Sequence, residues 1–139
     1  MELLDSYFGE WCLTRKSSDG YEFDGKAYFE FIGKHQLRLN EVGKSYYPSN
    51  ISVISQQNWI WKLEPPHSLK VFFDGEVDDI YHDVQTEKDD KAWIGSATHL
   101  CIEDTYSATY QFKKDEIIVS LKVEGPEKNY DLTSLFLRN

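Results

Sequence analysis

One histidine and one glutamate stand on the apolar side of segments that alternate between polar and apolar residues. His82 lies between Ile80 and Val84, and Glu41 lies two residues after Leu39. A histidine next to a carboxylate is the minimal general-base pair, so Glu41 and His82 are the candidate catalytic residues of a lyase, isomerase or hydrolase acting on a small molecule. Because burying either group without a partner is costly, they must pair with each other or bind something.

His99 and Cys101 form a second candidate set, because side chains two residues apart share one face of a strand. The apolar Leu100 and Ile102 compete for the core, so the sequence leaves open which face points inward. Cys101 is a nucleophile only if a histidine lowers the pKa of its thiol, and otherwise it is inert filling. With His82 and a carboxylate these side chains can ligate a metal, but their spacing matches no compact zinc motif and we predict no metal site.

Three interpretations of these polar groups stay open. They satisfy one another in a structural hydrogen-bond network, they line a pocket for a small, partly hydrophobic ligand, or they perform acid–base chemistry in that pocket. Aromatic side chains either supply the apolar wall of such a pocket or fill the interior as core. The candidate ligand-binding residues are His82, Glu41, His99, Cys101, Tyr106, Trp59, Trp61 and Phe73.

The dominant pattern along the chain is alternation with a period of two, which is typical of strands with one buried side. From Tyr21 to Phe31 every second residue forms one apolar face, opposite mostly charged residues. No segment has a sustained helical period, and only Glu2 to Phe8 is predicted to form a short helix. Further strands are predicted over residues 37–41, 59–63, 69–73, 80–84, 92–102, 105–112, 117–123 and 130–138, with loops at 48–50 and 85–91.

Nine or ten strands without helices between them cannot make a parallel sheet, because parallel neighbours need crossover connections. Consecutive hairpins favour a closed antiparallel barrel, which leaves no exposed sheet edge. Such a barrel is either hollow enough to hold one small ligand or filled, in which case its outer surface serves protein partners. The chain has 139 residues, a length typical of one domain, so we predict a single domain over residues 1–139.

The two ends of the chain carry a matched pair of residues. Gly9-Glu10-Trp11 near the start and Arg138 near the end resemble the closing signature of the lipocalin and fatty-acid-binding-protein superfamily, the calycins. A closed barrel pairs its first strand with its last, which places the Arg138 guanidinium on the Trp11 indole. The resemblance implies an all-β, antiparallel, up-and-down calycin-like barrel of 8–10 strands with a short N-terminal helix.

Several local motifs also recur together. They are Tyr7-Phe8-x-x-Trp11, Phe73-Asp74-Gly75, His99-x-Cys101-x-x-Asp104-x-Tyr106, Gly125-Pro126-x-Lys128-x-Tyr130 and Leu137-Arg138. In order and spacing they resemble a small family of uncharacterised bacterial and fungal proteins known only as a domain of unknown function. The resemblance covers nearly the whole chain and implies a calycin-like fold, but no activity, ligand or cofactor.

Composition excludes several classes of partner. The formal net charge is −9, which argues against nucleic acid and anionic membranes, because binding phosphates needs clustered Lys and Arg. No apolar run is long enough to span a bilayer, and the first five residues do not begin a signal peptide. Two cysteines make no disulfide framework, so we predict a reduced, cytoplasmic protein. The sequence indicates a small-molecule partner without naming it, and it does not indicate an oligomeric state.

Overall fold

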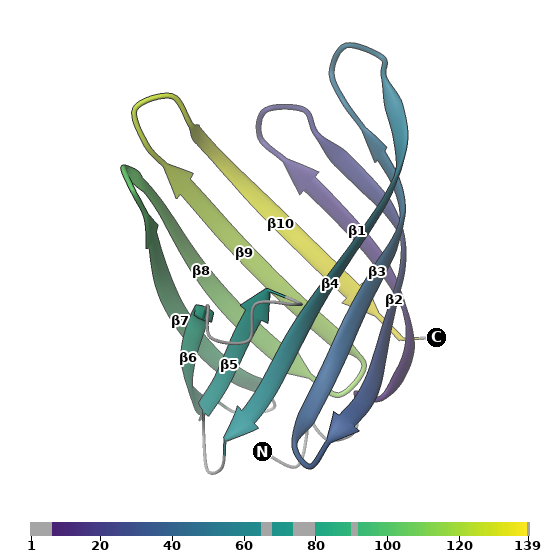
Figure 1. Ribbon diagram of the computed structural model, residues 1–139, viewed down its shortest axis with the longest axis vertical. Coiled ribbons are helices and arrows are strands. Elements are labelled where there is room, and N and C mark those ends of the chain that lie inside the picture. Colours follow the sequence, from purple (N-terminus) through teal and green to yellow (C-terminus); the bar gives the residue numbers. More distant parts are fainter. Residues whose placement is uncertain (1–6, 65–67, 74–79, 90–91, 139) are drawn as a thin grey trace.

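Ten antiparallel strands close into one barrel in a computed structural model that describes residues 7–64, 68–73, 80–89 and 92–138 (Figure 1). Each strand pairs with its neighbours in sequence, and β1 pairs with β10, so the described part has the predicted up-and-down topology. The strands are β1 (Gly9–Ser17), β2 (Glu22–Gly33), β3 (Gln36–Tyr46), β4 (Ser52–Glu64), β5 (Ser68–Phe73), β6 (Ile80–Asp89), β7 (Ala92–Cys101), β8 (Asp104–Lys113), β9 (Glu116–Glu124) and β10 (Asn129–Leu137).

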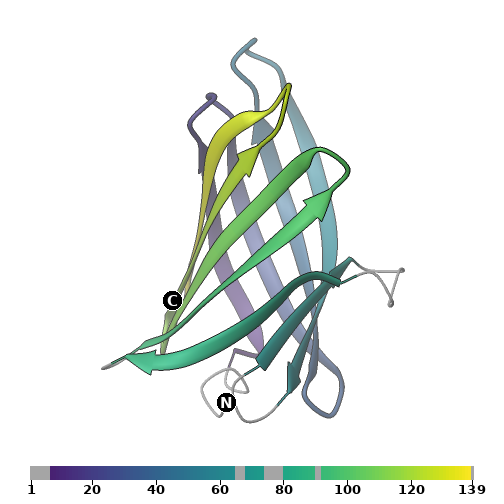
Figure 2. The same ribbon diagram turned by 90° about the vertical axis from the view of Figure 1, so that its left-hand side faces the viewer.

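The strands cross the barrel wall at a tilt, as closure of a sheet requires (Figure 2). The short β5 lies in the lower part of the wall, whereas the long hairpin of β3 and β4 runs its full height (Figure 1). The β1–β2, β3–β4, β7–β8 and β9–β10 connections all lie at one end, which we call the mouth. The opposite end, near which the chain enters β1, we call the floor.

Trp11 and Arg138 close the barrel as predicted. In the β1–β10 pairing Cys12 lies opposite Leu137, so the first strand meets the last at the floor. The guanidinium carbon of Arg138 lies 4.3 Å from the centroid of the Trp11 ring, and its Nη2 donates a 2.9 Å hydrogen bond to the carbonyl of Phe8. Arg138 therefore covers one side of the Trp11 ring, and the rest of the buried side chain contacts the core.

Aromatic side chains fill the floor half of the barrel. Tyr7 lies fully buried with its ring edge-on to Trp11, and its hydroxyl donates to the carbonyl of Lys113. Phe29 packs edge-on against both Trp11 and Trp61, at centroid distances of 6.3 and 5.0 Å. Edge-to-face contacts of this kind stabilise aromatic pairs beyond the burial of their area, so the floor is a packed core rather than a channel.

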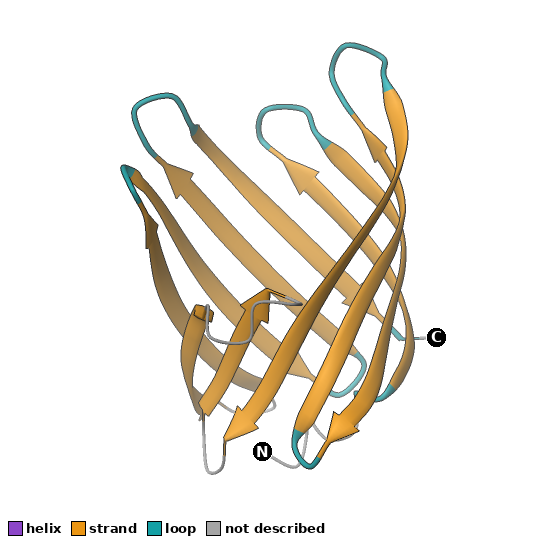
Figure 3. Ribbon diagram, viewed as in Figure 1, coloured by secondary structure: helices purple, strands orange, loops and turns teal. Residues whose placement is uncertain are grey.

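Three local expectations need correction or limits. The described residues contain no helix (Figure 3); the helix predicted over Glu2 to Phe8 lies mostly outside them, and Tyr7 and Phe8 lead into β1 without helical structure. Phe31 does not continue the inward face, because at the end of β2 it is 48% exposed and stacks on Phe8. Residues 85–89 are not a loop but the second half of β6, paired with β7.

The β4 strand also begins earlier than predicted, at Ser52 rather than residue 59, because cross-strand pairing with β3 extends through its polar half. The loop predicted at residues 48–50 is present. Among the residues that the structure describes, no helix has the length and apolar character to cross a membrane.

Candidate functional site

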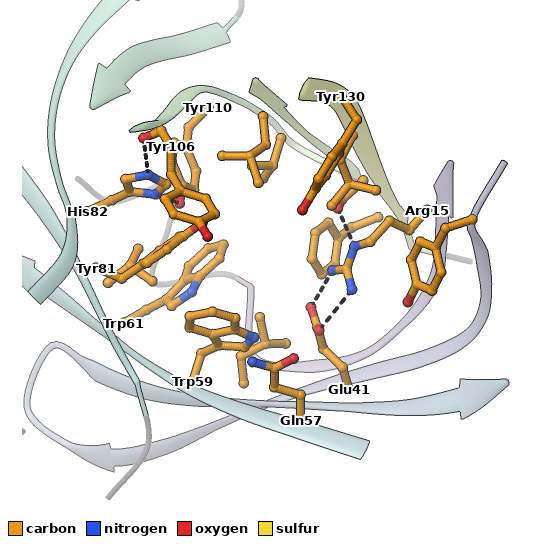
Figure 4. Close-up of a pocket in the computed structure, with 18 residues that line it drawn as sticks. Arg15, Glu41, Gln57, Trp59, Trp61, Tyr81, His82, Tyr106, Tyr110 and Tyr130 are labelled. Atoms are coloured by element: carbon orange, nitrogen blue, oxygen red, sulfur yellow. Dashed lines mark hydrogen bonds and ion pairs between the residues drawn. The ribbon is translucent and has the colours of Figure 1, made fainter. Parts of the chain in front are cut away.

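The mouth half of the barrel holds a cavity of about 290 Å³ between the packed floor and the open end (Figure 4). Its wall combines aromatic rings, aliphatic side chains and a few polar groups. Among the described residues it is lined by Arg15, Tyr21, Leu39, Glu41, Gln57, Trp59, Trp61, Val71, Tyr81, His82, Tyr106, Tyr110, Val119, Leu121, Tyr130, Leu132, Ser134 and Phe136.

Aromatic rings form one side of the cavity. Trp59 on β4 contacts Tyr81 on β6 at a centroid distance of 5.2 Å, and Tyr81 contacts the His82 ring at 4.0 Å. Trp61 lies deeper, edge-on to Tyr110. Figure 4 shows these rings gathered on one side, with the guanidinium and carboxylate of the opposite wall facing them. A flat apolar ligand would find stacking surface on this side.

An irregularity in β6 brings two successive residues to this wall. The register between β5 and β6 pairs Val71 with His82 and Phe72 with Ile80, so Tyr81 is an extra residue on β6. A strand without this bulge would turn adjacent side chains to opposite faces. Because of the bulge, both Tyr81 and His82 line the cavity.

His82 is buried and uses both of its ring nitrogens. Its Nε2 lies 3.3 Å from the carbonyl oxygen of Tyr106, which can only accept, so this nitrogen carries the proton. Its Nδ1 lies 2.7 Å from the hydroxyl oxygen of Tyr110, so that hydroxyl donates to the imidazole. Burial lowers the pKa of His82 to about 4, because the charged imidazolium is poorly solvated there. His82 is thus a neutral ring that orients Tyr110, whose own pKa burial raises.

Arg15 and Glu41 form an ion pair on the other side of the cavity. The Nη1 and Nη2 atoms of Arg15 donate to the two carboxylate oxygens of Glu41, at 3.2 and 2.8 Å. Its Nε donates to the hydroxyl of Ser134 at 2.6 Å. The side chains of Arg15 and Glu41 are 16% and 4% exposed. Burial opposes the charge on Arg15, but the adjacent carboxylate of Glu41 outweighs it and the pKa of Arg15 is raised.

A second hollow of about 380 Å³ adjoins the cavity on the far side of this ion pair and shares Arg15 and Glu41 with it. Polar side chains line it: the hydroxyl of Tyr21 lies 3.0 Å from that of Ser45, which lies 2.7 Å from that of Ser55. The aromatic side of the cavity and the polar hollow therefore stand on opposite sides of one ion pair.

A lysine stands at the mouth in the β9–β10 connection. The Nζ of Lys128 donates to the hydroxyl of Tyr106 at 3.3 Å and lies 3.6 Å from the carboxylate of Asp104. The hydrogen bond to Tyr106, with the charge of Asp104, raises the pKa of Lys128. These contacts tie the β9–β10 connection to β8 at the rim.

Five of the predicted site residues line the cavity and three do not. Glu41, His82, Tyr106, Trp59 and Trp61 line it. Phe73 and His99 lie behind it, packed against Tyr81 at centroid distances of 5.0 and 5.2 Å, and Cys101 is exposed at the end of β7.

The predicted general-base pair is not formed. Glu41 bonds Arg15 and His82 bonds Tyr110, and the two groups lie on different sides of the cavity (Figure 4). The residues described here bring no three histidine, cysteine, aspartate or glutamate side chains together as metal ligands.

Sequence reasoning missed Arg15, Tyr81 and Tyr130. Arg15 had a usable signal, because it continues the period-two face of Trp11 and Leu13. Tyr130 likewise begins an alternation that ends in the buried Phe136 on β10. Tyr81 had none, since a bulge follows from the pairing of β5 with β6 and not from periodicity.

Comparison with known proteins supports the fold. A family model described as a family of unknown function (DUF6314) matches residues 7–138. No curated protein sequence matches the chain.

Solved structures with little sequence identity share the barrel. The S-type phycobiliprotein lyase CPES from Guillardia theta superposes with a TM-score of 0.68 at 10% identity, covering 99% of this chain and 91% of that one. The T-type phycobiliprotein lyase CpeT from Prochlorococcus phage P-HM1 gives 0.57 at 11% identity, covering 99% and 96%. The redesigned β-barrel mFAP1, bound to DFHBI, gives 0.55 at 9% identity, covering 99% and 100%. At these identities the likeness concerns the fold alone, and it agrees with the calycin-like barrel expected from the sequence.

Proposed function

The chain belongs to the DUF6314 family, whose function is unknown, and we propose that its barrel binds a small, partly hydrophobic molecule in the mouth-half cavity. One observation carries this proposal: the floor half is packed with aromatic rings, while the mouth half encloses about 290 Å³ with both apolar and polar lining. That volume is close to the lower end of the range of small-molecule sites. A barrel that only supported an outer interaction surface would not need this hollow.

The hydrogen bonds of the two candidate catalytic residues favour binding over acid–base chemistry. A general base needs a free lone pair directed at the substrate. Both nitrogens of His82 are engaged by Tyr106 and Tyr110, and both carboxylate oxygens of Glu41 accept from Arg15. These hydrogen bonds hold the side chains of His82 and Glu41 in one orientation, so both are fixed parts of the cavity wall.

The similar structures support small-molecule binding only through the kind of fold that they share with this chain. One of them, mFAP1, is described as bound to DFHBI, and two others are phycobiliprotein lyases. We also propose a cytoplasmic location, supported by the low cysteine content of two residues in 139, which is too few for a disulfide framework.

A cavity-filling variant tests the proposal. The neutral naphthalene dye Prodan is titrated into the wild type, Leu121→Trp and Lys122→Trp, and its fluorescence is followed. Leu121 lines the cavity on β9, whereas Lys122 is the next residue and faces outward. We expect saturable binding to the wild type and to Lys122→Trp, and binding weakened at least about tenfold in Leu121→Trp, equivalent to about 1.4 kcal/mol.

Two results would contradict this. One is equal dye affinity of the two tryptophan variants, which would locate the dye elsewhere. The other is a wild type that binds no dye, carries no co-purified molecule in native mass spectrometry and keeps the same melting temperature across a metabolite panel.

A further inference from the structure

The charge of the cavity wall specifies the class of ligand. Arg15 and Glu41 are the charged side chains on the described lining of the cavity, and the same two are the charged side chains of the adjoining polar hollow. They neutralise each other through a bidentate contact. At the mouth, Lys128 is likewise paired with Asp104. We infer that the ligand of this cavity is an uncharged, ring-containing molecule with hydroxyl, carbonyl or amide groups, an inference that rests on the proposed binding function.

An anionic ligand would meet a cation that is already engaged. The guanidinium of Arg15 directs two nitrogens at Glu41 and the third at Ser134. An incoming carboxylate must displace Glu41 or lie beside it, and Glu41 is 4% exposed. Displacement leaves Glu41 buried without its counter-charge, and juxtaposition places two anions together. Either arrangement is costly, so an anion binds weakly.

A cationic ligand would meet an anion that is already engaged. Both oxygens of Glu41 accept from Arg15, so a ligand ammonium group must compete with a fixed guanidinium and lies next to its positive charge. On the opposite side of the cavity, His82 supplies no negative charge and donates to a backbone carbonyl. An ion of either sign loses its hydration on entering without gaining an opposite charge of its own.

An uncharged polar ligand finds matched partners instead. The described lining carries five tyrosines, whose hydroxyls both donate and accept, and the amide of Gln57, which does the same. The hydroxyl of Tyr110 already donates to His82 and that of Tyr106 accepts from Lys128, so the first keeps an acceptor and the second a donor for a ligand. The tyrosines are Tyr21, Tyr81, Tyr106, Tyr110 and Tyr130. Because a neutral phenol keeps its proton in this wall, with burial raising the pKa of Tyr81 and Tyr110, these groups offer hydrogen bonds without charge.

Three probes with one ring system separate ligand charge from ligand shape: naphthol, naphthoate and naphthylmethylammonium, substituted at the same ring position. Calorimetric titration at neutral pH gives a dissociation constant for each. We expect the wild type to bind naphthol at least about tenfold more tightly than either ion.

Two substitutions should shift this preference, one toward the anion and the other toward the cation. Glu41→Gln leaves Arg15 unpaired, so the affinity for naphthoate relative to naphthol should rise at least about tenfold. Arg15→Gln leaves Glu41 unpaired, and naphthylmethylammonium should gain by a similar factor. The double variant removes both charges and should keep the preference for naphthol. It replaces a single variant in the comparison if that variant fails to fold.

The matched control is an ion pair of the same type on the outer surface. Arg38 Nη1 lies 3.1 Å from Glu30 Oε1, and both side chains are well exposed. Glu30→Gln and Arg38→Gln should leave the ratios between probes within about twofold of the wild type, since exposed pairs contribute little.

The outcomes separate the two claims. Binding of Prodan without a preference for naphthol over both ions overturns the inference about charge and leaves the binding function standing. Unchanged probe ratios in Glu41→Gln and Arg15→Gln also overturn it. Absence of binding by Prodan and by all three probes overturns the proposed function and this inference with it.

Discussion

The neutral, buried imidazole of His82 makes the protein sensitive to mild acid. In the unfolded chain this histidine takes up a proton near pH 6.5, whereas in the folded barrel burial lowers its pKa to about 4. Between these values the unfolded state holds more protons than the folded one, so the free energy of unfolding falls as the pH falls. The contribution of His82 is complete above about pH 6.5 and is lost progressively down to about pH 4.

The size of the effect follows from the shift. One pKa unit corresponds to about 1.4 kcal/mol, so the full window is worth about 3.5 kcal/mol, of which about 2 kcal/mol is lost by pH 5. This is a large share of the stability of an ordinary domain. The side chain is 1% exposed, so solvent screens little of it.

The measurement is urea denaturation of the wild type and His82→Asn at pH values from 7 to 5. An asparagine retains an acceptor for the Tyr110 hydroxyl but cannot take up the proton. We expect His82→Asn to be less stable at pH 7, because the bond to the Tyr106 carbonyl is lost, and to lose about 2 kcal/mol less than the wild type on going to pH 5.

The matched control for removing a histidine is His35→Asn, in the β2–β3 turn, where the φ angle of 61° suits asparagine. The reasoning is refuted if the wild type and His82→Asn lose stability in parallel, within about 0.5 kcal/mol, across this window. An NMR titration that shows His82 gaining its proton near pH 6.5 in the folded protein would refute it as well.

Two further predictions concern the framework. Arg138→Ala should lower the free energy of unfolding by about 1–2 kcal/mol in urea denaturation, because the contact with Trp11 and the hydrogen bond to Phe8 are lost; a loss no larger than that of Arg38→Ala on the outer surface would contradict this. Gly25→Ala should destabilise the protein by more than about 2 kcal/mol, because the new Cβ would lie 2.2 Å from the carbonyl oxygen of Val42 and 2.6 Å from the Cα of Gly43. If Gly25→Ala has the melting temperature of the wild type, β2 and β3 can move apart at this point without cost, and the prediction is wrong.

Periodicity predicts which residues share a face, and that was enough for most of the fold. The alternation around Phe23 and Leu39 identified strands, and the pairing of Trp11 with Arg138 followed from the need of a closed barrel to join its ends. Residues 85–89 were misassigned because their charged side chains are typical of a loop, yet pairing with β7 holds them in a strand. A run of charged residues indicates that side chains are exposed to solvent, but it does not distinguish a loop from the exposed face of a strand.

The site was only partly predictable, because partners across a barrel are set by its closure. Glu41 and His82 were both expected inside and both are, but the sequence contains nothing that selects Arg15 over His82 as the partner of Glu41. The registers of β1 with β2 and of β2 with β3 place Arg15 level with Ser45 and Glu41 level with Trp11, so the distance between Arg15 and Glu41 is set across the barrel interior and not along one row of paired residues. Such a distance depends on strand tilt and register together, which no single strand encodes.

The position of the closing pair has a consequence for how this family can diversify. Trp11 and Arg15 lie on the same strand, four residues and therefore roughly 13 Å apart, one in the floor and the other in the ligand cavity. Substitutions that change what the mouth half recognises need not disturb the aromatic packing that specifies the fold. Selection, or a protein engineer, can thus retune recognition at one end of the barrel while the other end keeps the chain foldable.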